Sequence, residues 1–176
     1  DIPFPLIFTG PDSSEDYFKE IDRFIAGTLG SAAQQRYQII IDNPKQVARQ
    51  MQEGIQQVRK FRKDHGDAYY FNWLLKIDEV FQQPFMPTHQ NMRSLALHKD
   101  QISHQLAANL RRAFSGIVAG NVKDEGIRAI EQYGHFEICG DEDIMALMDS
   151  LLSSFVVQHR MKLPGKKYLP CYKIIQ

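Results

Sequence analysis

The first third of the chain contains the pattern that most restricts its fold, two apolar strands that are each followed by an amphipathic helix. The strands are predicted at residues 4–8 and 37–41. Both are continuous apolar runs, which are typical of parallel strands buried on two faces. The order strand–helix–strand–helix over residues 4–60 therefore predicts a parallel α/β sheet.

The two helices of this segment have recognisable starts. The first is expected over about residues 13–29 with Ser13 as its cap. Asn43 is expected to cap the second helix, and Pro44 suits its first position because proline needs no hydrogen-bond partner there. The apolar face of this second helix, which we expect to be buried, consists of Val47, Met51, Ile55 and Val58.

Two parallel strands do not make a stable sheet by themselves. A strand buried on both faces needs neighbours at both edges, and no element precedes residues 4–8 in this sequence. We therefore expect the chain to be the tail of a longer protein, cut through a sheet domain.

The rest of the chain predicts mainly helices, with a change of pattern near residues 60–66. Apolar residues alternate over residues 67–77, which favours a strand, and a further short helix is expected from Thr88. Pro170 within the last strand predicts an edge strand or a bulge. The other segments are predicted as helices at about 102–119, 123–133 and 141–159, and as strands at 136–139 and 168–175.

Composition and motifs exclude several classes of function. The chain has 21 basic and 21 acidic residues, which argues against a dedicated nucleic-acid binder. It has two distant cysteines, Cys139 and Cys171, and neither a membrane-length apolar run nor a secretory signal, so we expect a cytoplasmic protein with reduced thiols.

The sequence also lacks the familiar catalytic and metal-binding signatures. It contains no HxxxH, CxxC, GxSxG, GxGxxG or Gly-Gly, and no cysteine–histidine pattern specific enough to assign. We therefore predict no metal and no cofactor.

Three basic or polar clusters are candidate ligand contacts. Arg62 and Lys63 lie in a basic cluster at the end of the second helix, where cations also favour the helix dipole. The alternative is a polyphosphate clamp, with Tyr69 close enough in sequence to stack on a base.

The second cluster is the corner at residues 111–123, where a helix is expected to end at Gly120. Its small residues suit either tight helix packing or a ligand-facing turn with Asn121 and Lys123 as polar contacts. The third cluster contains Arg160, either as an ordinary helix end or as a contact to substrate or partner.

Several stretches together resemble bacterial pyrimidine/purine nucleotide 5′-monophosphate nucleosidases. They are residues 6–11 (LIFTGP), 37–51, 66–69 (GDAY) with 71–73 (FNW), 110–123 and 158–165. The resemblance implies that residues 1–58 are the end of a Rossmann-like "lonely guy" domain and residues 59–176 the family's own C-terminal domain. The fold class is then α/β: two βα units of a parallel sheet, followed by a mainly helical α+β domain with a few short strands.

The family hydrolyses nucleoside monophosphates to free base and ribose 5-phosphate, using a PGGxGT segment and a glutamate. That segment is absent here, so we assign no catalytic residue and expect this chain alone to be inactive. The resemblance also implies a homo-oligomer, a tetramer, that acts on nucleoside monophosphates.

The family binds the alarmone guanosine tetra- or pentaphosphate, and by position the contacts would be Lys63, Tyr69 and Lys123. Lysine at 63 replaces an expected arginine, which keeps the charge but loses the planar fork. Further phosphate or substrate contacts are proposed at Arg62, Asn121, Gly10 and Arg160. The alternative is a stand-alone nucleotide- or RNA-binding module without catalysis.

Overall fold

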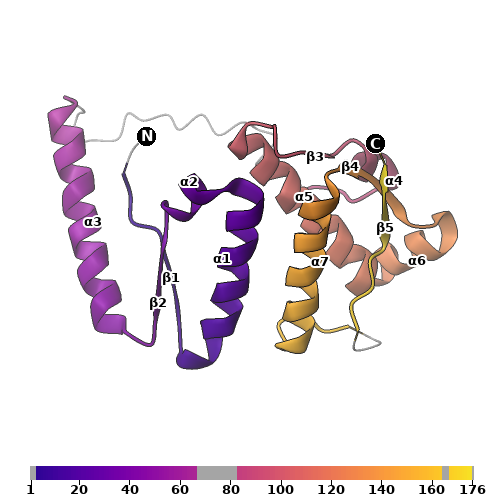
Figure 1. Cartoon of the computed structure of the whole chain (residues 1–176), viewed down its shortest axis with the longest axis horizontal. Coiled ribbons are helices and arrows are strands. Elements are labelled where there is room, and N and C mark those ends of the chain that lie inside the picture. The colour runs from indigo at the N-terminus through magenta and orange to yellow at the C-terminus, as the bar shows by residue number, and fades with distance from the viewer. Residues whose placement is uncertain (1–2, 67–82, 164–166, 176) are drawn as a thin grey trace.

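The computed structural model describes residues 3–66, 83–163 and 167–175. It is an α/β structure with two separate parallel sheets, one in each half of the chain, as Figure 1 shows. This confirms the predicted class, a short parallel sheet followed by a mainly helical part. None of the helices within the described ranges has the length and apolar character of a membrane span.

The N-terminal region, residues 3–66, is one βα unit followed by a second. Strand β1 pairs in parallel with β2, from Ile7 opposite Gln38 to Gly10 opposite Ile41. Figure 1 shows α1 on one side of this sheet and α3 on the other. The elements are β1 (Ile7–Gly10), the 3₁₀ turn η1 (Asp12–Ser14), α1 (Glu15–Leu29), α2 (Ser31–Gln34), β2 (Gln38–Ile41) and α3 (Pro44–Asp64).

The predicted starts of these elements are partly right. The cap of α3 is confirmed, since the Asn43 side chain accepts a 3.0 Å hydrogen bond from the backbone N–H of Gln46. The predicted cap at Ser13 is wrong, because Ser13 lies inside η1 and α1 begins at Glu15. The first strand also begins three residues later and ends two residues later than predicted, because the pairing with β2 sets its bounds.

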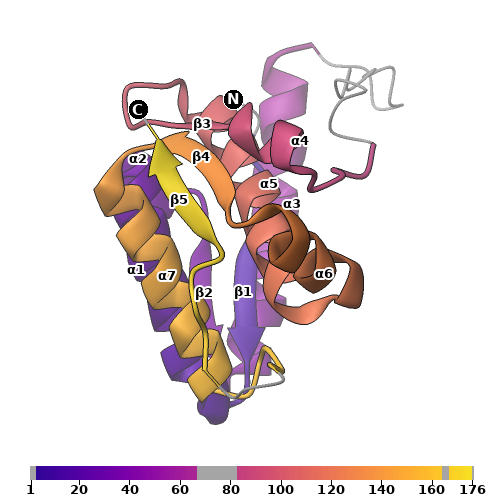
Figure 2. The ribbon, with the colours of Figure 1, turned by 90° about the vertical axis from the view of Figure 1, so that its right-hand side faces the viewer.

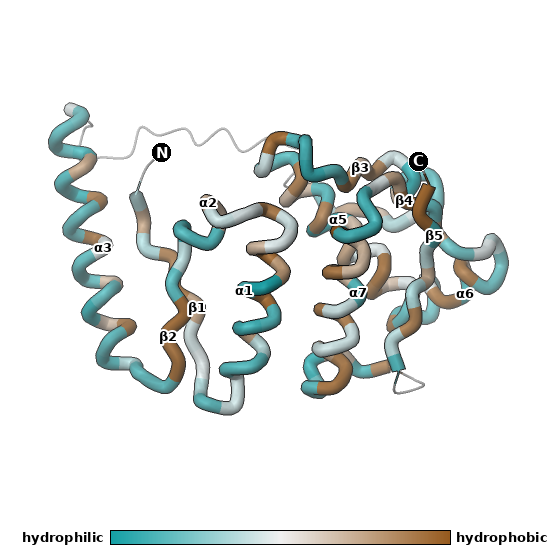
Figure 3. The backbone as a smooth tube through the Cα atoms, in the orientation of Figure 1, coloured by the Kyte–Doolittle hydropathy of each residue, from teal (hydrophilic) through white to brown (hydrophobic). Residues whose placement is uncertain are grey.

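The predicted buried face of α3 is not buried. No residue of α3 is buried, and Met51 and Ile55 are 39% and 44% exposed. The helix touches the segment before β1, since a methyl group added at Gly54 would lie 2.7 Å from the Cβ of Pro5. The mostly hydrophilic colouring of α3 in Figure 3 agrees with this sparse packing. The apolar stripe predicted the helix correctly, but too few of the described residues pack against α3 to bury that stripe.

The C-terminal region is mainly helical, and its three strands form a parallel sheet in the order β3-β4-β5. Figure 2 shows β5 beside β4. The described elements are α4 (His89–Arg93), β3 (Ala96–Leu97), α5 (Ser103–Val122), α6 (Asp124–Tyr133), β4 (Phe136–Gly140), α7 (Glu142–Val157) and β5 (Tyr172–Ile175).

Three expectations for this region need correction or fall outside it. Helix α5 does not end at Gly120 but continues to Val122. Strand β5 is an edge strand of the described sheet, which is one of the two predicted alternatives, but it begins at Tyr172, so Pro170 precedes the strand and requires no bulge. The two-residue strand β3 was not predicted, and the strand predicted at 67–77 lies outside the described residues.

One hydrophobic core joins the C-terminal region to helix α1. Phe24 of α1 is 8% exposed and belongs to this core, and Gly27 lets α1 approach Leu147 of α7 closely. Side chains with no exposed area include Met92, Leu97, Ala113, Ile117, Phe136, Ile138, Ile144, Met148 and Leu152. Burial of such side chains stabilises a fold by roughly 1.5–3 kcal/mol each.

Candidate functional site

The basic cluster at the end of α3 contains two of the predicted contacts, and one of these side chains is exposed. Lys63 lies in the last turn of α3 with an exposed side chain, and its backbone carbonyl accepts a 3.2 Å hydrogen bond from Gly66. Arg62 is half-buried. The third predicted residue, Tyr69, lies outside the described residues. Lys63 is therefore available to an anionic ligand.

The corner between α5 and α6 exposes Lys123 and turns Asn121 inward. The exposed Lys123 links the two helices: its N–H donates to Ala119 (3.0 Å), and its carbonyl accepts from Ile127 (2.9 Å). The Asn121 amide donates to the carbonyl of Ile117 (2.9 Å) and contacts the Sγ of Cys171 (3.4 Å). Asn121 thus holds the corner together, whereas Lys123 can meet a ligand.

The small residues of this corner serve close helix packing. A methyl group on Gly126 would lie 2.2 Å from the backbone oxygen of Ala119, and one on Gly120 would lie 2.8 Å from the Cys171 Sγ. No L-side chain is accommodated at such distances without movement. Of the two explanations offered by the sequence, tight packing is the one supported here.

Lys63 and Lys123 are far apart in a single chain. Figure 1 shows α3 near one end of the long axis and α6 near the other, and the view along that axis in Figure 2 places α3 behind α6. The structure therefore does not bring the two predicted alarmone contacts together within one molecule.

The structure does bring Gly10 and Arg160 into one corner, at the carboxyl end of β1. The Arg160 guanidinium donates to the Ser14 hydroxyl (3.0 Å) and lies 4.9 Å from the centre of the Tyr17 ring. A Cβ at Gly10 would lie 3.1 Å from Ser14, which is 6% exposed. Ligands of parallel α/β sheets bind beyond this end of the strands.

A cavity of about 370 Å³ opens beside this corner. Its walls combine positive and negative groups, which suits a polar ligand better than an apolar one. His159 has a left-handed backbone (φ 57°) and turns the chain after α7 so that Arg160 faces α1. The residues that line the cavity are Ser13, Asp16, Gln158, His159 and Arg160.

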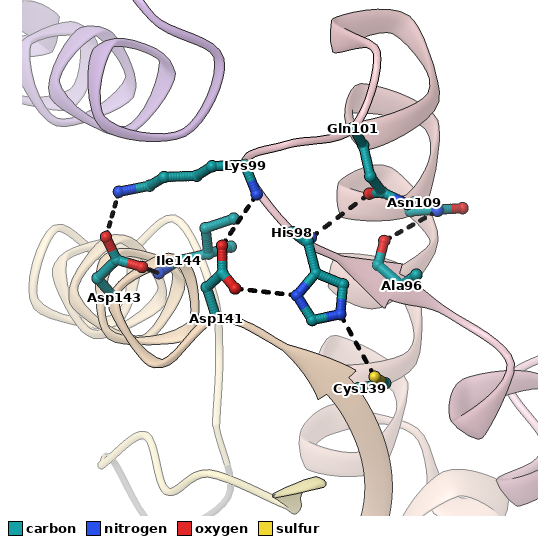
Figure 4. Close-up of polar contacts among 9 residues, drawn as sticks. All are labelled: Ala96, His98, Lys99, Gln101, Asn109, Cys139, Asp141, Asp143 and Ile144. Atoms are coloured by element: carbon teal, nitrogen blue, oxygen red, sulfur yellow. Dashed lines mark hydrogen bonds and ion pairs between the residues drawn. The ribbon is translucent and has the colours of Figure 1, made fainter. Parts of the chain in front are cut away.

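A cysteine, a histidine and an aspartate form a separate cluster at the carboxyl ends of β3 and β4 (Figure 4). His98 Nδ1 lies 2.9 Å from Asp141 Oδ1, and His98 Nε2 lies 3.4 Å from the Cys139 Sγ. The second oxygen of Asp141 accepts the backbone N–H of Lys99 (2.9 Å). The Lys99 ammonium in turn pairs with Asp143 at the start of α7.

These contacts stabilise the ionised form of Asp141. The hydrogen bond from His98 lowers the pKa of the Asp141 carboxyl, and the bond from the Lys99 backbone lowers it further. Hydrogen bonds donated to a carboxylate favour its charged form. Asp141 is therefore a carboxylate that accepts two hydrogen bonds at neutral pH.

Sequence reasoning did not identify this cluster. It found no cysteine–histidine pattern, because His98 and Cys139 are 41 residues apart. Each follows or ends a strand of the second sheet, and parallel strands place their carboxyl ends at one edge. To infer this proximity from the sequence, strand β3 would have to be predicted, and it is only two residues long.

Comparison with known proteins identifies the family. The model for "Pyrimidine/purine nucleotide monophosphate nucleosidase, C-terminal" matches residues 55–175. The chain belongs to this family. The family match begins at residue 55, inside α3. The predicted boundary between residues 58 and 59 also falls within this continuous helix.

Curated members of the family are closely similar to this chain. The pyrimidine/purine nucleotide 5′-monophosphate nucleosidases of Escherichia coli K12, E. coli O6:H1 and E. coli O157:H7 are each 56% identical to it over 170 residues. The alignment covers 97% of this chain and 37% of each relative. The chain thus spans a little over a third of the length of the nucleosidases that it matches.

Proposed function

We propose that this chain is part of a nucleosidase that converts nucleoside 5′-monophosphates and water to free base and ribose 5-phosphate. The observation that carries the proposal is the 56% identity to proteins of that name over 97% of the chain. The parent protein would be a cytoplasmic homo-oligomer, and a tetramer is expected. Residues 1–58 would belong to its catalytic Rossmann-like domain and residues 59–176 to its C-terminal domain.

This region would supply regulation and subunit contacts rather than the catalytic group. Glycosidic cleavage passes through an oxocarbenium-like state and needs a carboxylate beside the sugar, and backbone amides of glycines suit the 5′-phosphate. The chain contains no Gly-Gly pair and hence no PGGxGT segment. The chemistry would therefore be carried by the part of the relatives' length that this chain does not span.

The regulatory ligand would be guanosine tetra- or pentaphosphate, bound through Lys63, Tyr69 and Lys123. Both lysines have exposed side chains that a phosphate group can reach, and charge-assisted bonds to phosphate are strong. The two lysines lie at the end of α3 and at the start of α6, and these helices are near opposite ends of the long axis in Figure 1, so one ligand would meet both lysines if they come from different copies. Effector binding and subunit assembly would then be a single property of this region.

A first experiment tests where the chemistry is located. Purified 176-residue chain is incubated with AMP or GMP, and free base is measured by chromatography beside a full-length relative. We expect base release from the relative and none from this chain. Activity of the chain alone would contradict the assignment of catalysis to the other part of the protein.

A second experiment tests the alarmone contacts in the parent protein. Labelled guanosine tetraphosphate is titrated into wild type, Lys63→Ala and Lys123→Ala, with Lys45→Ala at the other end of α3 as the matched control. We expect each of the first two to weaken binding about ten- to a hundredfold, since a charge-assisted bond contributes roughly 1.5–3 kcal/mol. Equal affinity in Lys123→Ala would remove that residue from the site.

Mixing the two variants tests whether the pocket lies between copies. Oligomers reassembled from Lys63→Ala and Lys123→Ala subunits contain some pockets in which both lysines are intact, if the two come from different subunits. We expect a fraction of wild-type-affinity sites to return on mixing. No recovery in verified mixed oligomers would place both lysines in one subunit or outside the site.

A further inference from the structure

We propose that Cys139 is a histidine-activated thiol and a site of covalent modification by small peroxides and other small electrophiles. The reactive unit is the cluster of Cys139, His98 and Asp141 shown in Figure 4. It is built from two neighbouring strand ends and the start of α7, so its geometry is fixed by the sheet. It is independent of the lysines and the Arg160 corner described above.

The first step of the argument is the position of the proton on His98. Ionised Asp141 is purely a hydrogen-bond acceptor, so the His98 nitrogen that faces it, Nδ1, must carry a proton. The neutral ring then leaves Nε2 with its lone pair, and this nitrogen faces the Cys139 Sγ at 3.4 Å. His98 is thereby oriented to accept the thiol proton, as in other cysteine–histidine pairs.

The second step is that Asp141 is not used as an ordinary helix cap. It occupies the N-cap position of α7, where an aspartate usually accepts a backbone N–H from the first turn. Here its side chain makes no capping bond, and its oxygens accept from His98 and from Lys99. Asp141 is therefore a positioning residue that sets the tautomer of His98.

The third step excludes a metal site at this cluster. Cys139 and Asp141 lie on opposite ring nitrogens of His98, so the three side chains form a line and do not converge on one point (Figure 4). Among the described residues, no group of three or more His, Cys, Asp or Glu side chains is arranged to hold a metal ion. A proton relay fits this linear geometry.

The fourth step is accessibility. The side chains of His98 and Asp141 are 36% and 34% exposed, and Cys139 is partly exposed. The three residues are therefore partly open to solvent, as a site of modification by small solutes must be. Other charged groups lie near this face of the sheet: Lys99 with Asp143, Glu137 of β4 with Arg93 of α4, and Lys173 opposite Glu137 on β5.

The second cysteine of the chain provides an internal contrast. Cys171 is 6% exposed, and its thiol donates to the carbonyl of Ile117. Burial raises the pKa of Cys171 to about 11, which keeps it a neutral thiol at physiological pH. Cys171 lies beside the other end of β4, because Phe136 donates to its carbonyl, so it does not contact Cys139. Any difference in reactivity between the two thiols thus reports their surroundings.

With hydrogen peroxide as the oxidant, the Cys139 thiol and the His98 ring account for every bond and proton of the proposed reaction. The thiol proton moves to His98 Nε2, and the thiolate attacks one oxygen of the peroxide. An S–O bond forms, the O–O bond breaks, and the leaving hydroxide takes the proton from His98 to give water. Cys139 becomes a sulfenic acid, oxidised by two electrons, while the peroxide is reduced by two.

The test is site-resolved alkylation of the full 176-residue chain. Iodoacetamide is added at a series of pH values from 5 to 9, and modification of Cys139 and Cys171 is quantified by peptide mass spectrometry. We expect Cys139 to react at least about tenfold faster than Cys171 at pH 7, because the exposed thiolate is the reactive form. A rate for Cys139 at pH 7 that does not exceed the rate for Cys171 would overturn the proposal.

His98→Gln and Asp141→Asn separate activation from mere packing. In His98→Gln we expect the rate of Cys139 alkylation to fall about three- to tenfold at pH 7 and by less at pH 9, because the lost proton acceptor matters most where the thiol would otherwise keep its proton. Asp141→Asn should also lower the rate of Cys139 alkylation at pH 7 more than at pH 9, but by a smaller factor. Unchanged profiles in both variants, with thermal melting like that of wild type, would reject the relay.

Peroxide supplies the last arm of the test. After treatment with hydrogen peroxide, a dimedone adduct is expected on Cys139 and not on Cys171, and Cys139→Ser should remove it. If the histidine variant does not fold, this comparison within the wild-type chain still decides the question. Equal labelling of the two cysteines, or none on Cys139, would contradict the proposal.

Discussion

The two helices that flank the first sheet, α1 and α3, are comparably amphipathic and yet have different surroundings. α1 lies between the sheet and α7, and its Phe24 joins the core of the C-terminal region. α3 has no buried residue. The sequence pattern therefore specifies that a helix forms and which side is apolar, but burial also requires a partner.

The same contrast holds for the two regions as a whole. The buried apolar side chains of the described chain are concentrated in the C-terminal region, and residues 3–66 contribute Phe24 and Ile40. A sheet of two strands offers little area for packing. We therefore expect stability to reside mainly in the C-terminal region and α1.

The largest expected effect compares one isoleucine from each region. Ile117→Ala should lower the free energy of unfolding by about 2–5 kcal/mol, because Ile117 has no exposed area. Ile55→Ala should change it by less than about 0.5 kcal/mol, because that side chain is 44% exposed. Urea denaturation of both variants measures the difference.

A larger loss for Ile55→Ala in the full-length protein than in this chain would indicate that the apolar face of α3 is covered there. Similar losses for the two variants within this chain would contradict the proposed division of stability.

The next prediction compares two glycines at close contacts. Gly126→Ala should cost about 1–3 kcal/mol, because its methyl group would lie 2.2 Å from the rigid backbone of α5. Both substitutions gain about 1 kcal/mol in helix propensity, and at Gly54, where the added methyl group would meet the side chain of Pro5 at 2.7 Å, this gain roughly offsets the contact.

We therefore expect Gly54→Ala to be nearly neutral by thermal denaturation. A greater loss of stability in Gly54→Ala than in Gly126→Ala would show that the contact with Pro5 holds α3 more firmly than the exposure of α3 suggests.

A third prediction concerns alkaline pH. Burial raises the pKa of Cys171 to about 11, and burial followed by hydrogen bonds to Asp149 raises the pKa values of Tyr168 and Tyr172. The unfolded chain then loses these protons at lower pH than the folded chain, so their contribution to stability is complete below about pH 8 and falls as pH rises.

Between pH 8 and 10 we expect a loss of roughly 1–2 kcal/mol by urea denaturation. Cys171→Ala should reduce this pH dependence, whereas Tyr133→Phe, at a residue that is 67% exposed, should leave it unchanged. A pH dependence that survives in Cys171→Ala at full size would assign it to other groups.

The smallest predicted effect compares two helix caps with similar hydrogen bonds. Thr88 accepts from Asn91 at 3.2 Å at the start of α4, and Asn43 accepts from Gln46 at 3.0 Å at the start of α3. Thr88→Ala should lower global stability by about 1 kcal/mol, because α4 carries the fully buried Met92.

Asn43→Ala should instead fray α3 locally, with faster amide exchange in its first turns and little change in global stability. An equal global loss in both variants would mean that α3 unfolds together with the core.

Local signals in the sequence predicted much of the fold. The Asn43-Pro44 start of α3, the Thr88 cap of α4 and the inward face of α5 at Leu106, Leu110 and Ile117 all follow from rules that act within a few residues. They could be recognised because capping bonds and helical periodicity involve neighbours in the chain. The family resemblance was likewise carried by contiguous blocks.

The predicted site residues were less well constrained by such rules. Nothing local indicates that Arg160 would reach Ser14, 146 residues away, or that Asn121 would turn toward Cys171. The assignment of Lys63, Tyr69 and Lys123 to an alarmone stays a prediction, since it rests on resemblance and on contacts beyond one chain.

The sequence by itself determined where helices begin, which faces are apolar and which family the chain resembles, because these depend on residue type and short spacing. The tertiary structure alone decided that α1 is covered while α3 is exposed, and that His98 lies between Cys139 and Asp141. The physical reason is the same in both cases. Burial and proton relays depend on contacts between segments that are distant in the sequence. The two-residue strand β3 is too short to be recognised from the sequence, so the contacts that it creates could not be inferred.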